Sequence, residues 1–127
     1  ADLYARRLGE IEHQITVERD FMGVQEKIAA QIGSDAVVLY MKGQPQAPLC
    51  GFSANTVQIL NACGVSDFTA IDVLSDQEVR EGIKVFSSWP TIPQLYIKGE
   101  FIGGNDIVRE LYEQGELQKL LQSAKAG

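Results

Sequence analysis

Two cysteines and a single histidine are all that this chain offers for disulfide bonds or for nitrogen and sulfur ligation of metals. One cysteine pair provides no disulfide framework, which favours a reducing compartment. His13 has no cysteine or second histidine near it in the sequence, so we expect a solvated helix residue rather than a metal ligand. The fold must therefore depend on a hydrophobic core, and 127 residues that are 45% hydrophobic suffice for one globular domain.

The chain also lacks an excess of basic residues and any long apolar run. Its 17 acidic and 11 basic side chains give a net charge of −6, which argues against a nucleic-acid partner. No apolar run approaches the roughly 18 residues that cross a bilayer, so we expect no membrane association. Residues 1–21 carry acidic side chains and no apolar core, unlike transit or signal peptides. We therefore expect a bacterial cytoplasmic location, with an organelle matrix as the alternative.

Residues 1–21 form the first distinct segment of the sequence. Leu8, Ile11 and Ile15 recur at helical spacing, which predicts a short amphipathic helix. We interpret this segment as an N-terminal extension that precedes the main domain. Its pattern does not indicate what the extension does.

From residue 22 onward, helical and strand patterns alternate. Helices are predicted at 22–33, 51–63, 76–86 and 105–123, the last with a break at Gly115. Strands are predicted at 36–41, 68–73, 94–97 and 101–102, with a hairpin connection at 98–100 and a loop at 44–49. The first strand is a continuous apolar run, which predicts that it is covered on both faces, and the second strand is also predicted to be buried. This order predicts an α/β domain whose mixed sheet is covered by helices on both faces.

The most informative stretch is Cys50-Gly51-Phe52-Ser53, which has the spacing of a Cys-x-x-Cys redox pair with a hydroxyl in place of the second thiol. In a two-thiol site, the second thiolate resolves the mixed disulfide that forms on the first. Ser53 cannot do this, because its hydroxyl is hardly ionised near neutral pH and forms no stable bond to sulfur. Cys50 must therefore complete any exchange with a thiol from outside the chain.

Cys63 is the other thiol, and it is too far along the predicted helix to serve as that partner. At about 1.5 Å of rise per residue, the two sulfurs would lie on the order of 20 Å apart, whereas a disulfide needs Cα atoms within roughly 7 Å. Gly64 after it is suited to the left-handed position that ends a helix. We expect Cys63 to be a small buried hydrophobic residue, with a regulatory thiol as the alternative.

Cys50 is predicted to lie between the first strand and the helix that follows it. This is the edge of the sheet where open α/β folds place their sites. The unpaired N–H groups of a helix N-terminus favour a thiolate over a thiol. We therefore expect Cys50 to be reactive rather than structural.

The chain carries further motifs in a fixed order around this cysteine: Lys42-Gly43 with a loop that ends in Pro48-Leu49, then Cys50 to Ser53, then residues 89–94 (Trp-Pro-Thr-Ile-Pro-Gln), then residues 103–106 (Gly-Gly-Asn-Asp). Their order and spacing resemble the monothiol glutaredoxins of the Cys-Gly-Phe-Ser type. The resemblance implies a thioredoxin-like fold, with a mixed four-stranded sheet flanked by helices, over residues 22–123. Residues 1–21 would then be an extra helical segment, and 124–127 a C-terminal tail.

The resemblance also implies a set of glutathione-binding residues. Lys42 and Arg80 would contact the carboxylates of glutathione, with solvated surface charges as the alternative. Ile92 would offer its backbone to the cysteinyl unit, an arrangement that requires a cis peptide at Pro93 rather than an ordinary trans one. The remaining site residues are Gly104, Asn105 and Asp106, at a helix N-terminus that would hold the γ-glutamyl carboxylate.

Asn105 departs from the commonest family pattern, which has cysteine or serine at this position. Asn105 and Asp106 are predicted to begin the final helix. Because asparagine can still cap a helix and offer its N–H, we expect glutathione binding to be retained. An accessory thiol at this position is excluded. A pair of glycines at 103 and 104 is also consistent with a simple turn.

Counting ligands leads to a hypothesis about function. A [2Fe-2S] cluster usually needs four thiolates, and this chain offers Cys50. The resemblance implies that two chains and two glutathiones supply the four, so that a homodimer carries a labile cluster and transfers it to apo iron–sulfur proteins during their maturation. Cys50 would then be both the reactive thiol and the metal ligand.

Two other hypotheses stay open. Cys50 could act as the nucleophile of a glutathione-dependent disulfide oxidoreductase, which would make the protein at most a weak enzyme. A third reading is an adaptor that pairs with a BolA-type protein, as members of the family do. The long loop from Lys42 to Cys50 resembles the cluster-transferring class and favours the first hypothesis.

Overall fold

The computed structural model describes residues 2–126 of the chain. Helices and strands follow in the order α1 (Asp2–Gly33), β1 (Val37–Met41), β2 (Gly43–Gln44), β3 (Ala47–Pro48), α2 (Gly51–Ala62), β4 (Thr69–Asp72), α3 (Gln77–Ser87), β5 (Gln94–Ile97), β6 (Glu100–Gly103), α4 (Asn105–Glu113) and α5 (Glu116–Ala126). The main strands and the helices that follow residue 50 are confirmed to within a few residues. None of the helices in this part of the chain is both long and apolar enough to span a bilayer.

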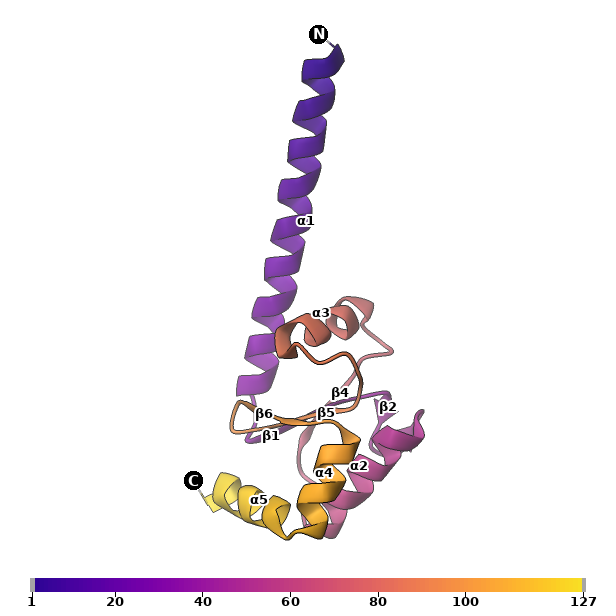
Figure 1. Cartoon of the computed structure of the whole chain (residues 1–127), viewed down its shortest axis with the longest axis vertical. Helices are drawn as coiled ribbons and strands as arrows, with labels where there is room; N and C mark the ends of the chain where they lie inside the picture. Colours follow the sequence, from indigo (N-terminus) through magenta and orange to yellow (C-terminus); the bar gives the residue numbers. More distant parts are fainter. Residues whose placement is uncertain (1, 127) are drawn as a thin grey trace.

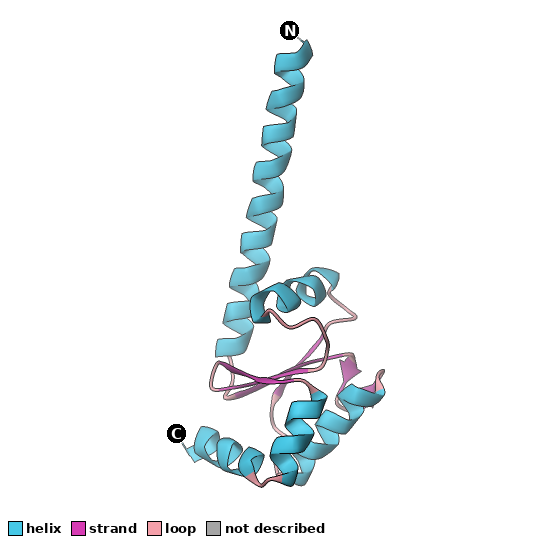
Figure 2. Ribbon diagram, in the orientation of Figure 1, coloured by secondary structure: helices cyan, strands magenta, loops and turns pink. Residues whose placement is uncertain are grey.

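A four-stranded sheet with the strand order β4-β1-β5-β6 forms the centre of the domain (Figure 2). β1 runs parallel to β4 and antiparallel to β5, and β5 runs antiparallel to β6. The sheet is therefore mixed, as predicted. The parallel pair arises because α2 carries the chain back across the sheet, whereas the turn at Lys98-Gly99 makes a simple hairpin.

The side chains of β1 alternate between two hydrophobic cores, one on each face of the sheet. Leu39 and its same-face neighbours pack with residues of α2, α4 and α5. Tyr40 points to the other face and packs with residues of α1 and α3, among them Ile28 and Ile83. Figure 1 shows the same layers, with α2, α4 and α5 below the sheet and α1 and α3 above it. Because β1 is covered on both faces, its sequence is a continuous apolar run.

Two strand predictions need correction. β4 is only half-buried rather than buried, because it is an edge strand that pairs with β1 alone. Residues 44–49 are not a plain loop, since β2 and β3 pair as a short hairpin with a turn at Pro45 and Gln46. Gly43 makes this hairpin possible: its φ is +87°, and a Cβ there would lie 2.7 Å from the carbonyl oxygen of Ala47. The hairpin ends two residues before Cys50 and so fixes the path of the backbone that leads to this cysteine.

α1 differs most from its prediction. It is one continuous helix of 32 residues, not a short helix followed by a second one at residue 22. Its C-terminal part packs on α3, whereas residues 3–23 are exposed along the part that rises away from the domain in Figure 1. Residues 2–21 are thus helical as expected, and the domain boundary at residue 22 stays a prediction. His13 is exposed, as predicted.

The helix ends were easier to predict, because glycine marks them. Gly64 takes a φ of +80° just after Cys63, the residue that caps α2. Gly115 takes a φ of +76° and separates α4 from α5, which confirms the predicted break. Cys63 is half-buried and packs against the core below the sheet.

Candidate functional site

An open pocket of about 470 Å³ lies where β1 ends and α2 begins. The residues that line it come from five separate parts of the chain: Lys42, Cys50, Phe52, Arg80, Lys84, Trp89, Pro90, Thr91, Ile92, Pro93, Gly104, Asn105, Asp106 and Ile107. All the residues that the sequence indicated as glutathione contacts are among them. Their roles in binding stay predictions, whereas their meeting in one pocket is a property of the fold.

Two residues of the Cys-Gly-Phe-Ser loop do not line the pocket. Gly51 is the exposed first residue of α2. Ser53 is fully buried, and its Oγ accepts a hydrogen bond of 3.1 Å from the backbone N–H of Lys42. The hydroxyl that replaces the second thiol therefore fixes the backbone beside Lys42 instead of facing a ligand.

Cys50 is half-buried at the N-cap position of α2, in extended backbone with a φ of −151°. Burial acts to raise the pKa of its thiol, but the backbone N–H groups of Ser53 and Phe52, the Ser53 hydroxyl and the Lys42 ammonium outweigh burial, and the pKa is lowered. The N–H groups, the hydroxyl and the ammonium all stabilise the thiolate form of Cys50. Burial alone raises the pKa of the Cys63 thiol.

This contrast predicts different reactivity of the two thiols. In a Cys63→Ser protein, the alkylation rate of Cys50 should fall only as the pH drops through a midpoint below the free-thiol value of about 8.5, because the thiolate persists to lower pH. In the matched Cys50→Ser protein, Cys63 should react more slowly, with a midpoint above that value. Iodoacetamide rates measured against pH test both, and a Cys50 midpoint at or above the free-thiol value would contradict the assignment.

Positive charge is concentrated on one wall of the pocket, where α3 presents Arg80 and Lys84. The Nε of Arg80 is buried and has no hydrogen-bond partner among the described residues. Lys84 forms only a long ion pair with Glu81, with 3.8 Å between nitrogen and oxygen. Sequence reasoning missed Lys84, although its place one helical turn after Arg80 puts it on the same face of α3. Lys42 also lines the pocket, so the pocket is suited to anions.

The loop between α3 and β5 forms the floor of the pocket. The peptide bond between Ile92 and Pro93 is cis, as predicted. Gln94 is fully buried and supports this loop: its Nε2 donates to the carbonyl oxygens of Trp89 at 3.1 Å and Thr91 at 3.2 Å. Its Oε1 accepts from the Tyr96 hydroxyl at 3.1 Å, so the amide is satisfied on both sides. Gln94 therefore holds the loop from behind, a role that the sequence did not reveal.

α4 begins at Asn105, as predicted, but the Asn105 side chain does not cap the helix. Gly104 is the N-cap residue, and no side chain caps the helix. Asn105 is buried, and its Nδ2 donates to Oδ1 of Asn55 at 2.8 Å and to Oγ1 of Thr56 at 3.0 Å. Asn105 does not act as a cap because it is the first helical residue, and its amide points across to α2. Asn105 thereby links the helix that begins at Cys50 to the helix that begins at Gly104.

Three of the residues that line the pocket have large exposed apolar side chains, and so does Leu49, the neighbour of Cys50 in the chain. Leu49, Phe52, Trp89 and Ile107 are exposed by 69%, 62%, 39% and 37%. Trp89 is supported from below by Phe101, with ring centroids 5.9 Å apart. We call these four residues the apolar rim. So many exposed large side chains around one reactive thiol indicate a surface that another molecule covers.

The chain is similar to known proteins over most of its length. The model of the Glutaredoxin family matches residues 37–102. A protein described as an uncharacterized monothiol glutaredoxin, ycf64-like, from Synechocystis is 52% identical over 100 residues, which cover 79% of this chain and 92% of the relative. A probable monothiol glutaredoxin, GrlA, from Legionella pneumophila is 54% identical over 89 residues, covering 70% of this chain and 99% of the relative.

The fold is also similar to that of glutaredoxins whose structures have been solved. The solution structure of reduced poplar apo GrxS14 superimposes with a TM-score of 0.71 at 44% sequence identity. The match covers 80% of this chain and 93% of the poplar protein. Both the sheet and the helices that form the pocket therefore have counterparts of known structure.

Proposed function

This chain belongs to the monothiol glutaredoxins and has their thioredoxin-like fold, and from that premise we propose that it binds glutathione and carries a labile [2Fe-2S] cluster between two copies of itself. One observation carries the proposal. The pocket holds a single thiol with a lowered pKa, together with Lys42 and Arg80, neither of which forms a salt bridge among the described residues. Such a site is suited to a ligand that carries both a thiol and negatively charged groups, and glutathione has a thiol and two carboxylates.

The charge of the pocket supports glutathione as the ligand. Glutathione has two carboxylates separated by a cysteinyl unit, so it needs anion contacts on both sides of its thiol. Lys42 and Arg80 are suited to one carboxylate, and the buried Nε of Arg80 would gain a partner that it now lacks. The free N–H groups at the start of α4 are suited to the other carboxylate.

The donor count supports a cluster shared between copies. Among residues 2–126, no group of three or more histidine, cysteine, aspartate or glutamate side chains is placed to hold a metal ion. Cys50 is the one cysteine that lines the pocket, so the three further thiolates of a [2Fe-2S] cluster would come from two glutathiones and a second Cys50. The apolar rim supports the pairing, because a facing copy would bury these side chains. A cluster held half by a diffusible tripeptide is cargo that can be handed on.

Disulfide exchange is the second candidate, and the lowered pKa of Cys50 favours it. The Cys50 thiolate would attack the glutathione sulfur of a glutathionylated protein and release that protein's thiolate. A second glutathione thiolate would then attack the mixed disulfide, release Cys50 and leave as oxidised glutathione. Each turnover consumes one free glutathione, because the other half of the oxidised glutathione comes from the substrate. Exchange needs no second copy of the chain, which separates it from cluster carriage.

Anaerobic reconstitution distinguishes the two candidates. Iron, sulfide and glutathione are added to the reduced protein, and visible absorption and molar mass are then measured together. The carrier function predicts a coloured dimer with one cluster per two chains, which does not form when glutathione is omitted. A colourless protein that nevertheless reduces a glutathionylated peptide would overturn the carrier function in favour of exchange. Delivery to apo iron–sulfur proteins, pairing with a BolA-type protein and the bacterial cytoplasmic location stay predictions.

A further inference from the structure

Most of α1 has no packing partner among the described residues. Its C-terminal turns contact the domain, where Ile28 is buried and Gln25 Nε2 donates to the carbonyl oxygen of Gly82 at 2.9 Å. Residues 3–23, in contrast, are all exposed. In Figure 1 this part of the helix stands clear of the domain. A long helix that is exposed on all sides needs an explanation, because helices gain most of their stability by packing.

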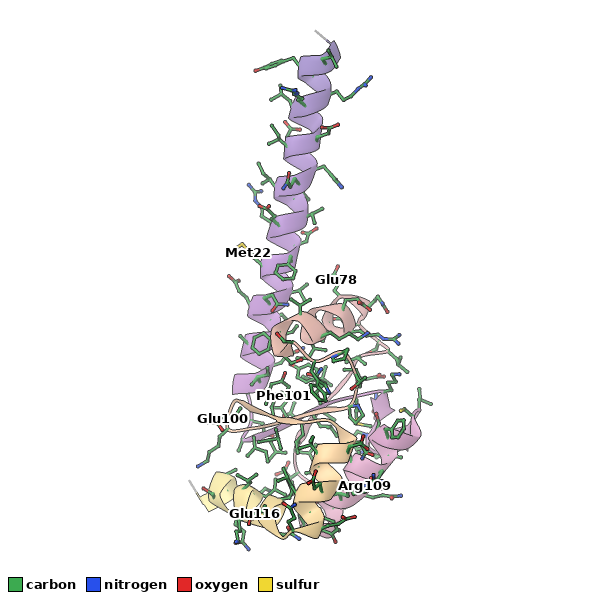
Figure 3. All side chains as sticks on the ribbon, in the orientation of Figure 1. Met22, Glu78, Glu100, Phe101, Arg109 and Glu116 are labelled. Carbon is green, nitrogen blue, oxygen red and sulfur yellow. The ribbon has the colours of Figure 1, made fainter. Side chains whose placement is uncertain are left out.

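An apolar stripe runs along the exposed part of α1 at alternating spacings of four and three residues. We call this set the α1 stripe: Tyr4, Leu8, Ile11, Ile15, Glu18 and Met22. Its five apolar members are between 43% and 71% exposed. The spacing is that of the a and d positions of a coiled coil. In Figure 3, Met22 points to the side of α1 opposite α3, so a helix lying on the stripe would not meet α3.

We propose that the α1 stripe is a self-association surface on which two copies of this chain pair as antiparallel helices. The stripe is complementary to itself in one antiparallel register, in which each a position meets a d position of the second copy. Ile11 then faces Ile15 of the second copy, and Tyr4 faces Met22. A twofold axis relates the two chains, so each of these contacts occurs twice. In this register every apolar residue of the α1 stripe except Leu8 faces another apolar residue.

The charged residues explain why the second copy should be antiparallel. Glu18 is the one acidic member of the stripe, and the proposed register places it opposite Leu8 and beside Arg7 of the second copy. Arg7 is exposed and forms no salt bridge among the described residues, so it is available for this pairing. A parallel pair in register would instead bring the two Glu18 carboxylates together in the seam, which is unfavourable.

The same register brings Glu12 of one chain close to Glu12 of the second chain, near the twofold axis that relates them. Like charges at such flanking positions weaken a coiled coil. Glu12→Gln should therefore tighten the dimer, and the gain should shrink at high salt. If α1 does not pair with a second chain, Glu12→Gln should leave the association unchanged.

This surface is separate from the glutathione pocket, because no residue of α1 lines the pocket. The test can therefore be made without iron, sulfide or glutathione, in a Cys50→Ser/Cys63→Ser protein that forms neither a cluster nor a disulfide. Failure of this inference would leave the proposed function untouched, and failure of the proposed function would leave this inference untouched.

Sedimentation equilibrium of this cysteine-free protein, up to a concentration of about 1 mM, measures the association. We expect a monomer–dimer equilibrium whose dissociation constant rises roughly tenfold or more in Ile15→Glu, because a charge enters the seam. His13→Glu adds the same charge on the opposite side of the helix and should leave the equilibrium near that of the parent. Circular dichroism of both variants checks that α1 stays helical. A parent that is monomeric throughout, or an Ile15→Glu protein that associates as well as His13→Glu, would overturn the proposal.

Disulfide trapping tests the orientation. Tyr4→Cys and Met22→Cys are introduced separately into the cysteine-free protein, and the two proteins are mixed and oxidised by air. The antiparallel register predicts cross-links between the two proteins, which mass spectrometry distinguishes from cross-links of one protein with itself. Predominant Tyr4→Cys self-cross-linking would show a parallel pair and reject the antiparallel register. An absence of cross-links in a protein that sediments as a dimer would place the interface outside the α1 stripe.

Discussion

A Cys50→Ser protein is expected to lose both cluster binding and thiol exchange completely, whereas a Cys63→Ser protein should keep both. Cys50 is the thiol that lines the pocket, and its pKa is lowered at the start of α2. Serine at this position would offer a hydroxyl that neither ligates a cluster nor attacks a disulfide. Cys63 lies at the other end of α2, against the core, so its replacement should cost only some stability.

Reconstitution followed by visible absorption, together with a glutathionylated-peptide assay, measures both losses. Urea unfolding of each variant provides the control, because it separates a chemical effect from a folding defect. A folded Cys63→Ser protein that failed to hold a cluster would contradict the assignment of Cys50 as the chain's ligand. A second, shallower pocket, which Cys63 lines together with Lys125, would then have to be considered as the cluster site.

The second large effect is expected at the basic wall of the pocket. Replacing Lys42 or Arg80 by alanine should remove a charge-assisted contact to a glutathione carboxylate, worth about 1.5 to 3 kcal/mol, or roughly a ten- to hundredfold loss of affinity. The cluster would need two glutathiones, so the loss would occur in each half of the dimer. The holo-dimer of Lys42→Ala should therefore decay much faster in low glutathione than in high glutathione.

Cluster lifetime at several glutathione concentrations measures this effect. Lys119→Ala is the matched control, because it removes an exposed lysine of α5 that lies outside the pocket. Cys50 should remain open to alkylation in Lys42→Ala, which shows that the thiol itself is intact. If glutathione concentration had no influence on cluster lifetime in either the parent or Lys42→Ala, the missing thiolates would have to come from another source.

Most of the secondary structure could be predicted from the sequence, since it is set by local patterns. Apolar periodicity located the helices, and glycines such as Gly64 and Gly115 marked where they end. The errors arose where neighbours in space decide the outcome. β4 was predicted to be buried, but its position at the sheet edge leaves it half-buried. The continuity of α1 was missed because Gly23 interrupts the pattern without interrupting the helix.

Most of the residues that line the pocket could likewise be predicted, in this case from sequence motifs. Residues such as Lys42, Cys50 and Pro93 were identified because their motifs occur in a characteristic order, and the fold brings them into one pocket. Lys84 was not identified because it belongs to none of these motifs, and the motif that contains Gln94 does not reveal that its side chain supports the loop. The direction of the Asn105 side chain depended on the crossing of α4 and α2, which no local pattern encodes.

The sequence by itself determined the chemistry of this protein: one thiol in a Cys-x-x-Ser loop, no internal thiol to resolve it, and hence a need for an external one. These conclusions depend only on which residues are present and how far apart they are along the chain. The tertiary structure decided the rest: which cations face that thiol, which side chains surround it, and that the first part of α1 is left exposed. Those properties depend on contacts between residues that are distant in sequence, and packing of the two cores sets them only when the chain has folded.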